Sequence, residues 1–181
     1  MRVAPDEGQD SNTDENRFAA WVGEHGRAVR GFLLAMVRRA DVADDLCQDV
    51  FVRAWQARDK YTEQGKTRSY LLRIADRLVC DRRRASGRAS NLDDDGWDMN
   101  QPASVGPGPA EAVVLSEQVQ QLNEAMKCLA PTQQRVLLLR YYGQMSFQEI
   151  ADAIDVPLNT ALSHCHRALE ALRKILVEDS V

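Results

Sequence analysis

The sequence lacks paired cysteines, has few glycines and prolines, and contains no long apolar run. Its 181 residues include only 4 cysteines, 10 glycines and 6 prolines. The cysteines are widely spaced without a CxxC pair, which argues against a disulfide framework or zinc site and favours a reducing compartment. No stretch approaches the ~20 apolar residues of a membrane span, and no N-terminal run resembles a signal peptide. We therefore expect a cytoplasmic protein without membrane insertion.

Strict alternation of apolar and polar residues, the pattern of a half-buried strand, is also absent. Apolar residues make up 44% of the chain and recur at three- to four-residue steps in 18–36, 42–55 and 71–78. Three such helices can close one small core. The same spacing returns in 114–129, and Pro131 suits the start of a further helix. The predicted fold class is all-α.

A basic excess is lacking, because 23 Lys and Arg residues stand against 27 Asp and Glu residues, for a net charge of −4. The charges are nevertheless segregated along the chain. Residues 1–15 are predicted to be a disordered acidic tail. Residues 87–110 contain an Asp run and Val-Gly-Pro-Gly-Pro, which predict a flexible acidic linker. The expected organisation is therefore two small helical domains, 16–86 and 111–181, joined by that linker.

A helix-turn-helix is predicted in the second domain. Ser146 to Glu149 has the form of a capping box, in which each residue satisfies a backbone amide of the other. Asp155 stands at the turn and tolerates left-handed geometry, and Pro157 suits the start of the next helix. That helix is polar at its start, which favours a DNA-reading motif over an ordinary helical hairpin. The side chains expected to face the groove are Asn159, Thr160, Ser163, His164 and Arg167.

A row of arginines is predicted on one face of the helix near residues 69–88. At 100° per residue the row spans about 60° and centres about 130° from the apolar face. A solvated charged face is the alternative, since Asp76 and Asp81 interrupt the row. Nearby cations and tyrosines favour contact with melted DNA, because phosphates attract the cations and unstacked bases lie on aromatic rings. The expected contacts are Lys60, Tyr61, Lys66, Arg68, Tyr70, Arg73, Arg77 and Arg84.

Three segments resemble the sigma-70 family of transcription initiation factors. Residues 41–55 look like the polymerase-binding segment of the family, and residues 69–84 resemble the segment associated with the −10 element. Residues 129–143, with the helix-turn-helix after them, resemble the −35-reading domain. Because only these two domains are present, the resemblance is to the extracytoplasmic-function (ECF) group. The polymerase-binding residues that the resemblance implies are Asp44, Asp45, Leu46, Gln48, Asp49 and Phe51.

The resemblance also implies the partners, which are bacterial core RNA polymerase and promoter DNA, duplex at −35 and melted at −10. An anti-sigma factor is common in the family, although no residue of this sequence identifies one. The chain departs from the family in the recognition helix, where Leu162 and His164 stand at positions that commonly carry Lys and Arg. This departure implies a weaker grip on phosphates or a different −35 sequence.

Two other classes of protein are alternatives. A stand-alone helix-turn-helix regulator that binds an operator would explain residues 131–176 but leave the acidic and arginine-rich segments unused. An enzyme could be suspected from His164-Cys165-His166, but successive helical residues point about 100° apart and cannot converge on one centre. No P-loop or nucleophile elbow occurs. We expect no catalytic residue, no cofactor and no metal site.

Overall fold

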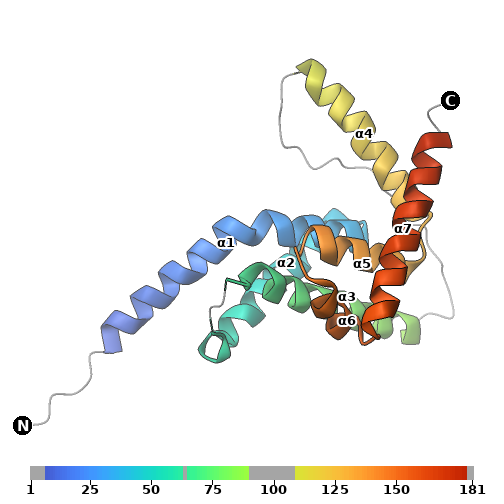
Figure 1. Ribbon diagram of the computed structural model, residues 1–181. Coiled ribbons are helices and arrows are strands. Elements are labelled where there is room, and N and C mark those ends of the chain that lie inside the picture. The colour runs from blue at the N-terminus through green and yellow to red at the C-terminus, as the bar shows by residue number, and fades with distance from the viewer. Residues whose placement is uncertain (1–6, 63–64, 90–108, 179–181) are drawn as a thin grey trace, which may run out of the picture.

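The computed structural model describes residues 7–62, 65–89 and 109–178, and within these ranges the chain is all-helical. The two predicted helical domains are present, and their elements follow one another along the chain as drawn in Figure 1. The N-terminal domain consists of α1 (Glu7–Val37), α2 (Ala40–Gln56), the short 3-10 helix η1 (Arg58–Lys60) and α3 (Thr67–Ala89). The C-terminal domain consists of α4 (Pro109–Lys127), α5 (Pro131–Tyr141), α6 (Phe147–Ile154) and α7 (Leu158–Glu178).

The N-terminal domain is a bundle in which α1, α2 and α3 all pack on one another. Its centre is filled by apolar side chains at the spacing that predicted the helices, and each helix contributes a fully buried stripe. The largest of these side chains are Phe32, Leu33, Val50, Leu71 and Leu72. The first turns of α1, from Glu7 onward, extend beyond the bundle as an arm (Figure 1).

The helices extend further than the sequence predicts. α1 begins at Glu7, so residues 7–15 are helical where a disordered tail was expected. A helix that is already nucleated gains one hydrogen bond for each residue added, and acidic residues favour the positive end of the helix dipole. Likewise α3 ends at Ala89 and α4 begins at Pro109, which shortens the predicted linker at both ends. The rest of the tail and linker, residues 1–6 and 90–108, lies outside the described residues.

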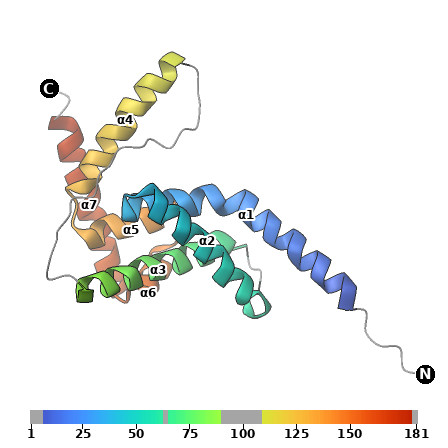
Figure 2. The same cartoon turned by 180° about the vertical axis from the view of Figure 1, so that it is seen from behind.

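The C-terminal domain packs α5, α6 and the outer helix α4 against α7. Val136, Leu139 and Ile150 are fully buried in its core. Two side chains of the apolar pattern in 114–129 are instead exposed, Val119 (43%) and Leu122 (44%), and Leu169 of α7 is exposed as well (42%). Among the described helices α4 packs mainly on α7, from which it diverges in Figures 1 and 2, so part of the surface of both helices is left uncovered.

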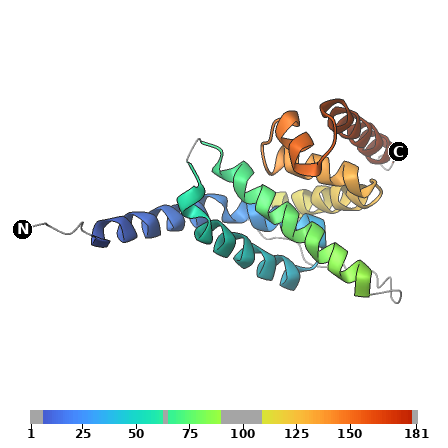
Figure 3. The ribbon, with the colours of Figure 1, turned by 90° about the horizontal axis from the view of Figure 1, so that it is seen from below.

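The two domains pack directly against each other. α5 lies beside α1, and the loop between α5 and α6 meets the start of α3, as the view from below in Figure 3 shows. Buried side chains of both domains form one continuous apolar cluster. The sequence predicted two domains but did not predict this contact between them.

Candidate polymerase and nucleic-acid interfaces

The outer face of α2 is acidic and exposed. Asp45, Gln48 and Asp49 lie on successive turns with their side chains open to solvent. Asp44 is exposed as well, but its carboxylate accepts a hydrogen bond from Arg30 Nε of α1 at 2.6 Å. Four of the six predicted polymerase-binding residues therefore lie together on one accessible surface.

Leu46 and Phe51, the other two, lie in the core of the domain. Their side chains are only 5% and 7% exposed, and the Phe51 ring packs edge-on against Phe18 with centroids 6.1 Å apart. Both belong to the apolar stripe that holds α2 on the bundle, so their direct contact with polymerase stays a prediction that their burial does not favour. Their contribution is to position the acidic face.

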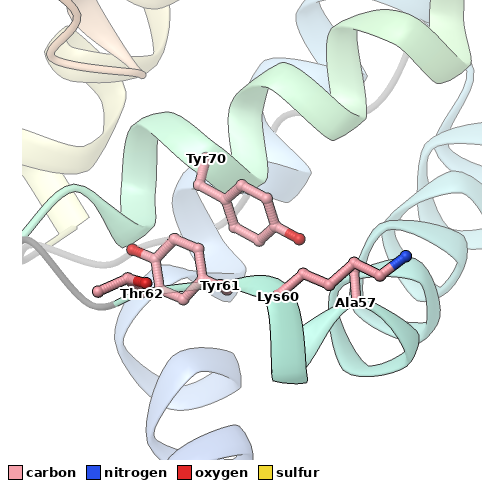
Figure 4. Close-up of a pocket in the computed structure, with 5 residues that line it drawn as sticks. All are labelled: Ala57, Lys60, Tyr61, Thr62 and Tyr70. Atoms are coloured by element: carbon pink, nitrogen blue, oxygen red, sulfur yellow. The ribbon is translucent and has the colours of Figure 1, made fainter.

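A surface pocket of about 480 Å³ lies where η1 meets α3 (Figure 4). The rings of Tyr61 and Tyr70 are stacked beside it, with centroids 4.5 Å apart and an angle of 28° between their planes. Trp21 supports the pair from below through an edge-on contact with Tyr61 at 5.2 Å. The residues that line the pocket are Ala57, Lys60, Tyr61, Thr62 and Tyr70.

The polar groups of this pocket are suited to a neutral ring with a nearby phosphate. Burial raises the pKa of Tyr70, so its hydroxyl remains protonated and can donate a hydrogen bond at neutral pH. The Tyr61 hydroxyl is 3.2 Å from the Thr67 hydroxyl, which fixes the ring. Lys60 is exposed at the rim and supplies a cation. An aromatic surface beside a cation can bind an unstacked base and its phosphate.

The arginines of the predicted row on α3 differ in their exposure to solvent. Arg77 and Arg84 are exposed, and Arg84 pairs with Asp81 one turn earlier at 3.3 Å. Arg73 is half-buried, and its Nε has no hydrogen-bond partner among the described residues. Only the outer part of the row is therefore a solvent-exposed cationic face.

The first turn of α3 and Lys66, the residue just before it, contact the C-terminal domain. Lys66 Nζ lies 3.0 Å from a carboxylate oxygen of Glu149, and Arg68 Nε donates to the backbone carbonyl of Tyr142. The two side chains were predicted to meet DNA, but in this structure their partners are oxygen atoms of the helix-turn-helix domain.

An ion pair that the sequence did not predict joins Asp76 of α3 to Arg135 of α5. Two guanidinium nitrogens donate to the two carboxylate oxygens, with Nε to Oδ1 at 2.6 Å. Asp76 is 1% and Arg135 21% exposed. Burial acts to lower the pKa of Arg135, but the hydrogen bond and charge of Asp76 outweigh it and raise that pKa. A carboxylate between Ala75 and Leu78, on the apolar side, signals a buried charge that needs a cation, but not which cation.

The predicted helix-turn-helix is confirmed in its local geometry. Ser146 Oγ accepts a hydrogen bond from the Glu149 amide at 3.2 Å, and the Ser146 amide donates to the Glu149 carboxylate at 2.9 Å. Asp155 ends α6 in the left-handed conformation at φ 57°. The Ser146 amide, followed by the Ser146 hydroxyl and Lys66, lowers the pKa of Glu149 to about 2.

This lowered pKa makes the motif sensitive to acid. A carboxylate whose pKa is depressed on folding stabilises the protein above its ordinary pKa of 4.5, and that contribution is lost as the pH falls toward about 2. Glu149→Gln should lower the free energy of unfolding by about 1–2 kcal/mol at neutral pH. The difference from wild type should shrink between pH 4.5 and 2, as measured by urea unfolding at several pH values. Glu170→Gln, on the exposed side of α7, is the control, and a gap that is constant with pH would contradict the assignment.

The predicted DNA-reading side chains lie on two sides of α7. Asn159, Ser163 and Arg167 are exposed in a line at four-residue spacing, whereas Thr160 and His164 are half-buried. Ser163 Oγ donates to the Asn159 carbonyl at 2.8 Å, so its oxygen is left to accept. In the neighbouring His-Cys-His segment one side chain is half-buried, the next buried and the third exposed, and these do not converge.

No helix within residues 7–62, 65–89 and 109–178 combines the length and the apolarity that crossing a lipid bilayer requires. The same residues contain no group of three or more His, Cys, Asp or Glu side chains placed to hold a metal ion.

A helical bundle joined to a helix-turn-helix domain is the architecture of a DNA-binding transcription protein, and comparisons with known proteins specify it. The model of Sigma-70 region 2 matches residues 21–89, and that of Sigma-70, region 4 matches residues 119–172. ECF RNA polymerase sigma factor SigW of Bacillus subtilis is 29% identical over 169 residues, which cover 90% of each chain. SigK of Mycobacterium bovis is 24% identical and covers 90% of this chain and 87% of its own.

Solved structures show the same fold. The sigma factor RpoE of Bartonella quintana, in complex with the anti-sigma factor NepR, has a TM-score of 0.69 at 20% identity, over 88% of this chain and 96% of its own. CnrH, in complex with the cytosolic domain of CnrY, has a TM-score of 0.61 at 22% identity, over 91% and 90%. Because the two sigma-70 models together match more than half of the chain, it belongs to the sigma-70 family, as an ECF RNA polymerase sigma factor.

Membership of this family identifies the function, which the fold alone does not. The protein directs core RNA polymerase to promoters and initiates transcription, and it is not itself an enzyme. A stand-alone helix-turn-helix regulator does not account for the match of region 2 to residues 21–89.

Proposed function

We propose that the two domains read different parts of one promoter, the N-terminal domain melted −10 DNA and the C-terminal domain duplex −35 DNA. The observation that carries the first assignment is the stacked pair of Tyr61 and Tyr70 beside Lys60. A flipped base can lie on such rings while cations bind the adjacent phosphates. The line from Asn159 to Arg167 supports the second assignment, because the second helix of this motif enters the major groove with its first turns.

We also propose that the outer face of α2 is the surface that binds polymerase. Asp45, Gln48 and Asp49 are exposed, and Asp44 is held at the edge of this face by Arg30. These side chains leave the Tyr61–Tyr70 pocket free, so one domain can bind polymerase and DNA at once. Polymerase tethers both domains near a single promoter and raises their effective concentration there, so neither domain needs tight binding on its own.

The site of action and a regulator follow from the same assignment. A bacterial polymerase and its template are cytoplasmic, and we propose that compartment for this chain. RpoE was solved with an anti-sigma factor, and we propose a partner of that class here.

The arginine row on α3 provides the test of the −10 assignment. Arg73→Ala combined with Arg77→Ala should reduce promoter opening about tenfold or more, because two phosphate contacts are lost. Permanganate footprinting with holoenzyme measures the opening, and a pull-down with core polymerase should show unchanged binding.

The control for this experiment is Arg82→Ala, an exposed arginine of the same helix outside the proposed contacts. Loss of polymerase binding with opening preserved would reverse the assignment. Sequencing of transcripts made by core polymerase with this protein identifies the promoters that the assay needs.

A further inference from the structure

The two tyrosines of the pocket beside η1 are stacked on each other, so each ring covers one face of the other. Their centroids are 4.5 Å apart, and their planes are inclined by 28°. A base that lay between two rings would need about 6.8 Å, which is two stacking steps of about 3.4 Å. The face of Tyr70 that Tyr61 covers is therefore open to a base only when one of the two rings moves away.

The two rings are held by different kinds of backbone. Tyr70 belongs to α3, and its amide donates to the Lys66 carbonyl at 3.0 Å. Tyr61 follows η1, and its backbone is extended at φ −90° and ψ 118° (Figure 4). Turning Tyr61 away breaks no helix, whereas moving Tyr70 would disturb the first turn of α3. Tyr61 is therefore the ring that can leave.

The place that Tyr61 occupies is suited to a base. Trp21, which is only 5% exposed, makes edge-on contacts with Tyr61 at 5.2 Å and with Tyr70 at 6.5 Å. The Tyr61 hydroxyl is 3.2 Å from the hydroxyl of Thr67, a residue that is 6% exposed. Departure of the phenol ring leaves a space between aromatic rings with a buried hydroxyl at its edge. A base is a flat ring with polar groups at its edge, so it can replace both the stacking contact and the hydrogen bond.

We propose that Tyr61 is a plug, which occupies the base site on Tyr70 until a flipped −10 base displaces it. This inference rests on the proposed function, since it needs the pocket to be the −10 site, and it gives the two tyrosines opposite roles. A base stacks on an aromatic side chain more strongly than two such side chains stack on each other, so an unpaired base can displace the plug. A base in a duplex must also lose its pairing. The plug therefore favours DNA that has already melted.

The experiment measures binding of holoenzyme to single-stranded DNA by fluorescence anisotropy. The probe is a labelled non-template oligonucleotide that spans the −10 element of a promoter identified by transcript sequencing. Tyr61→Ala should bind it about two- to tenfold tighter than wild type, because no side chain competes for the face of Tyr70. Tyr70→Ala should bind it about fivefold more weakly or worse, because the stacking surface is lost. Tyr141→Ala is the control, since that tyrosine is 63% exposed on α5, and it should match wild type.

A set of oligonucleotides with a single abasic site shows whether the variants act on the same base. Removal of the flipped base should weaken binding to wild type, and the loss should be about two- to tenfold larger for Tyr61→Ala, which pays nothing to displace the plug. Tyr70→Ala should be almost insensitive to the abasic site. The same variants should bind core polymerase as wild type does.

A folded Tyr61→Ala chain that binds the oligonucleotide no more tightly than wild type would overturn the plug. If circular dichroism shows that this variant has lost helicity, Tyr61→Phe decides instead. It keeps the ring but not the bond to Thr67, so it should bind about twofold tighter or more, and equal or weaker binding would refute the proposal. If Tyr70→Ala binds as wild type does and no abasic site weakens wild type, the −10 assignment itself has failed, and the plug with it.

Discussion

Phe51→Ala should lower the free energy of unfolding by about 3–5 kcal/mol, because it leaves a cavity at the centre of the N-terminal bundle. The ring is 7% exposed and packs on Phe18 of α1, so its loss removes a contact between α2 and the helix that supports it. Urea unfolding followed by circular dichroism measures the change. Polymerase binding should fall with stability and recover at lower temperature or with a stabilising osmolyte.

Asp49 lies two positions before Phe51 on the same helix, but Asp49→Arg should impair polymerase binding without lowering the stability of the fold. This side chain is exposed on the acidic face, so the free energy of unfolding should stay within about 0.5 kcal/mol of wild type. Affinity for core polymerase should fall about tenfold or more, since like charges across an interface repel. A Phe51→Ala chain of native stability that fails to bind polymerase would show that the ring makes direct contact, contrary to its place in the core.

These two residues illustrate how far the sequence predicts a site. The family resemblance marks residues 44–51 as one functional segment, and helical periodicity predicts that such a segment has two faces. Which residues face inward depends on where α1 and α3 pack, and that is settled by the bundle as a whole. Leu46 and Phe51 lie in the predicted segment but on its buried face.

The structural features that depend on residues close together in the chain were predicted most accurately from the sequence. The capping box of α6, the left-handed turn at Asp155 and the proline at the start of α5 each depend on residues within a few positions of one another. The corresponding geometry could be predicted from the sequence because no distant contact decides it.

Contacts between segments far apart in the chain could not be predicted in the same way. Asp76 and Arg135 are 59 positions apart, and each has other charged residues nearby with which it could pair. The sequence indicated that a carboxylate lay on an apolar face, but only the packing of α5 on α3 selects the partner. The exposure of Val119 and Leu122 also depends on contacts between distant segments. Periodicity predicts an apolar stripe, but it does not predict whether another helix covers that stripe.

Replacing both Asn159 and Arg167 by alanine should abolish most promoter-specific transcription, with a loss of about thirtyfold or more. Each side chain that reads a base edge contributes about 1–3 kcal/mol to discrimination, and both lie on the exposed line of α7. Neither side chain is part of the core, so the free energy of unfolding should remain close to that of wild type. Transcription in vitro from a promoter with an intact −35 element measures the loss.

The control is Arg173→Ala, an exposed arginine farther along the same helix, which should retain nearly full activity. Substituting the −35 sequence should reduce wild-type transcription while leaving the double variant almost unaffected, because that variant no longer reads the element. If the double variant still distinguished the two promoters as well as wild type does, the reading residues would have to lie elsewhere. His164 and Thr160 would then be the next to test, since they flank the line and are only half-buried.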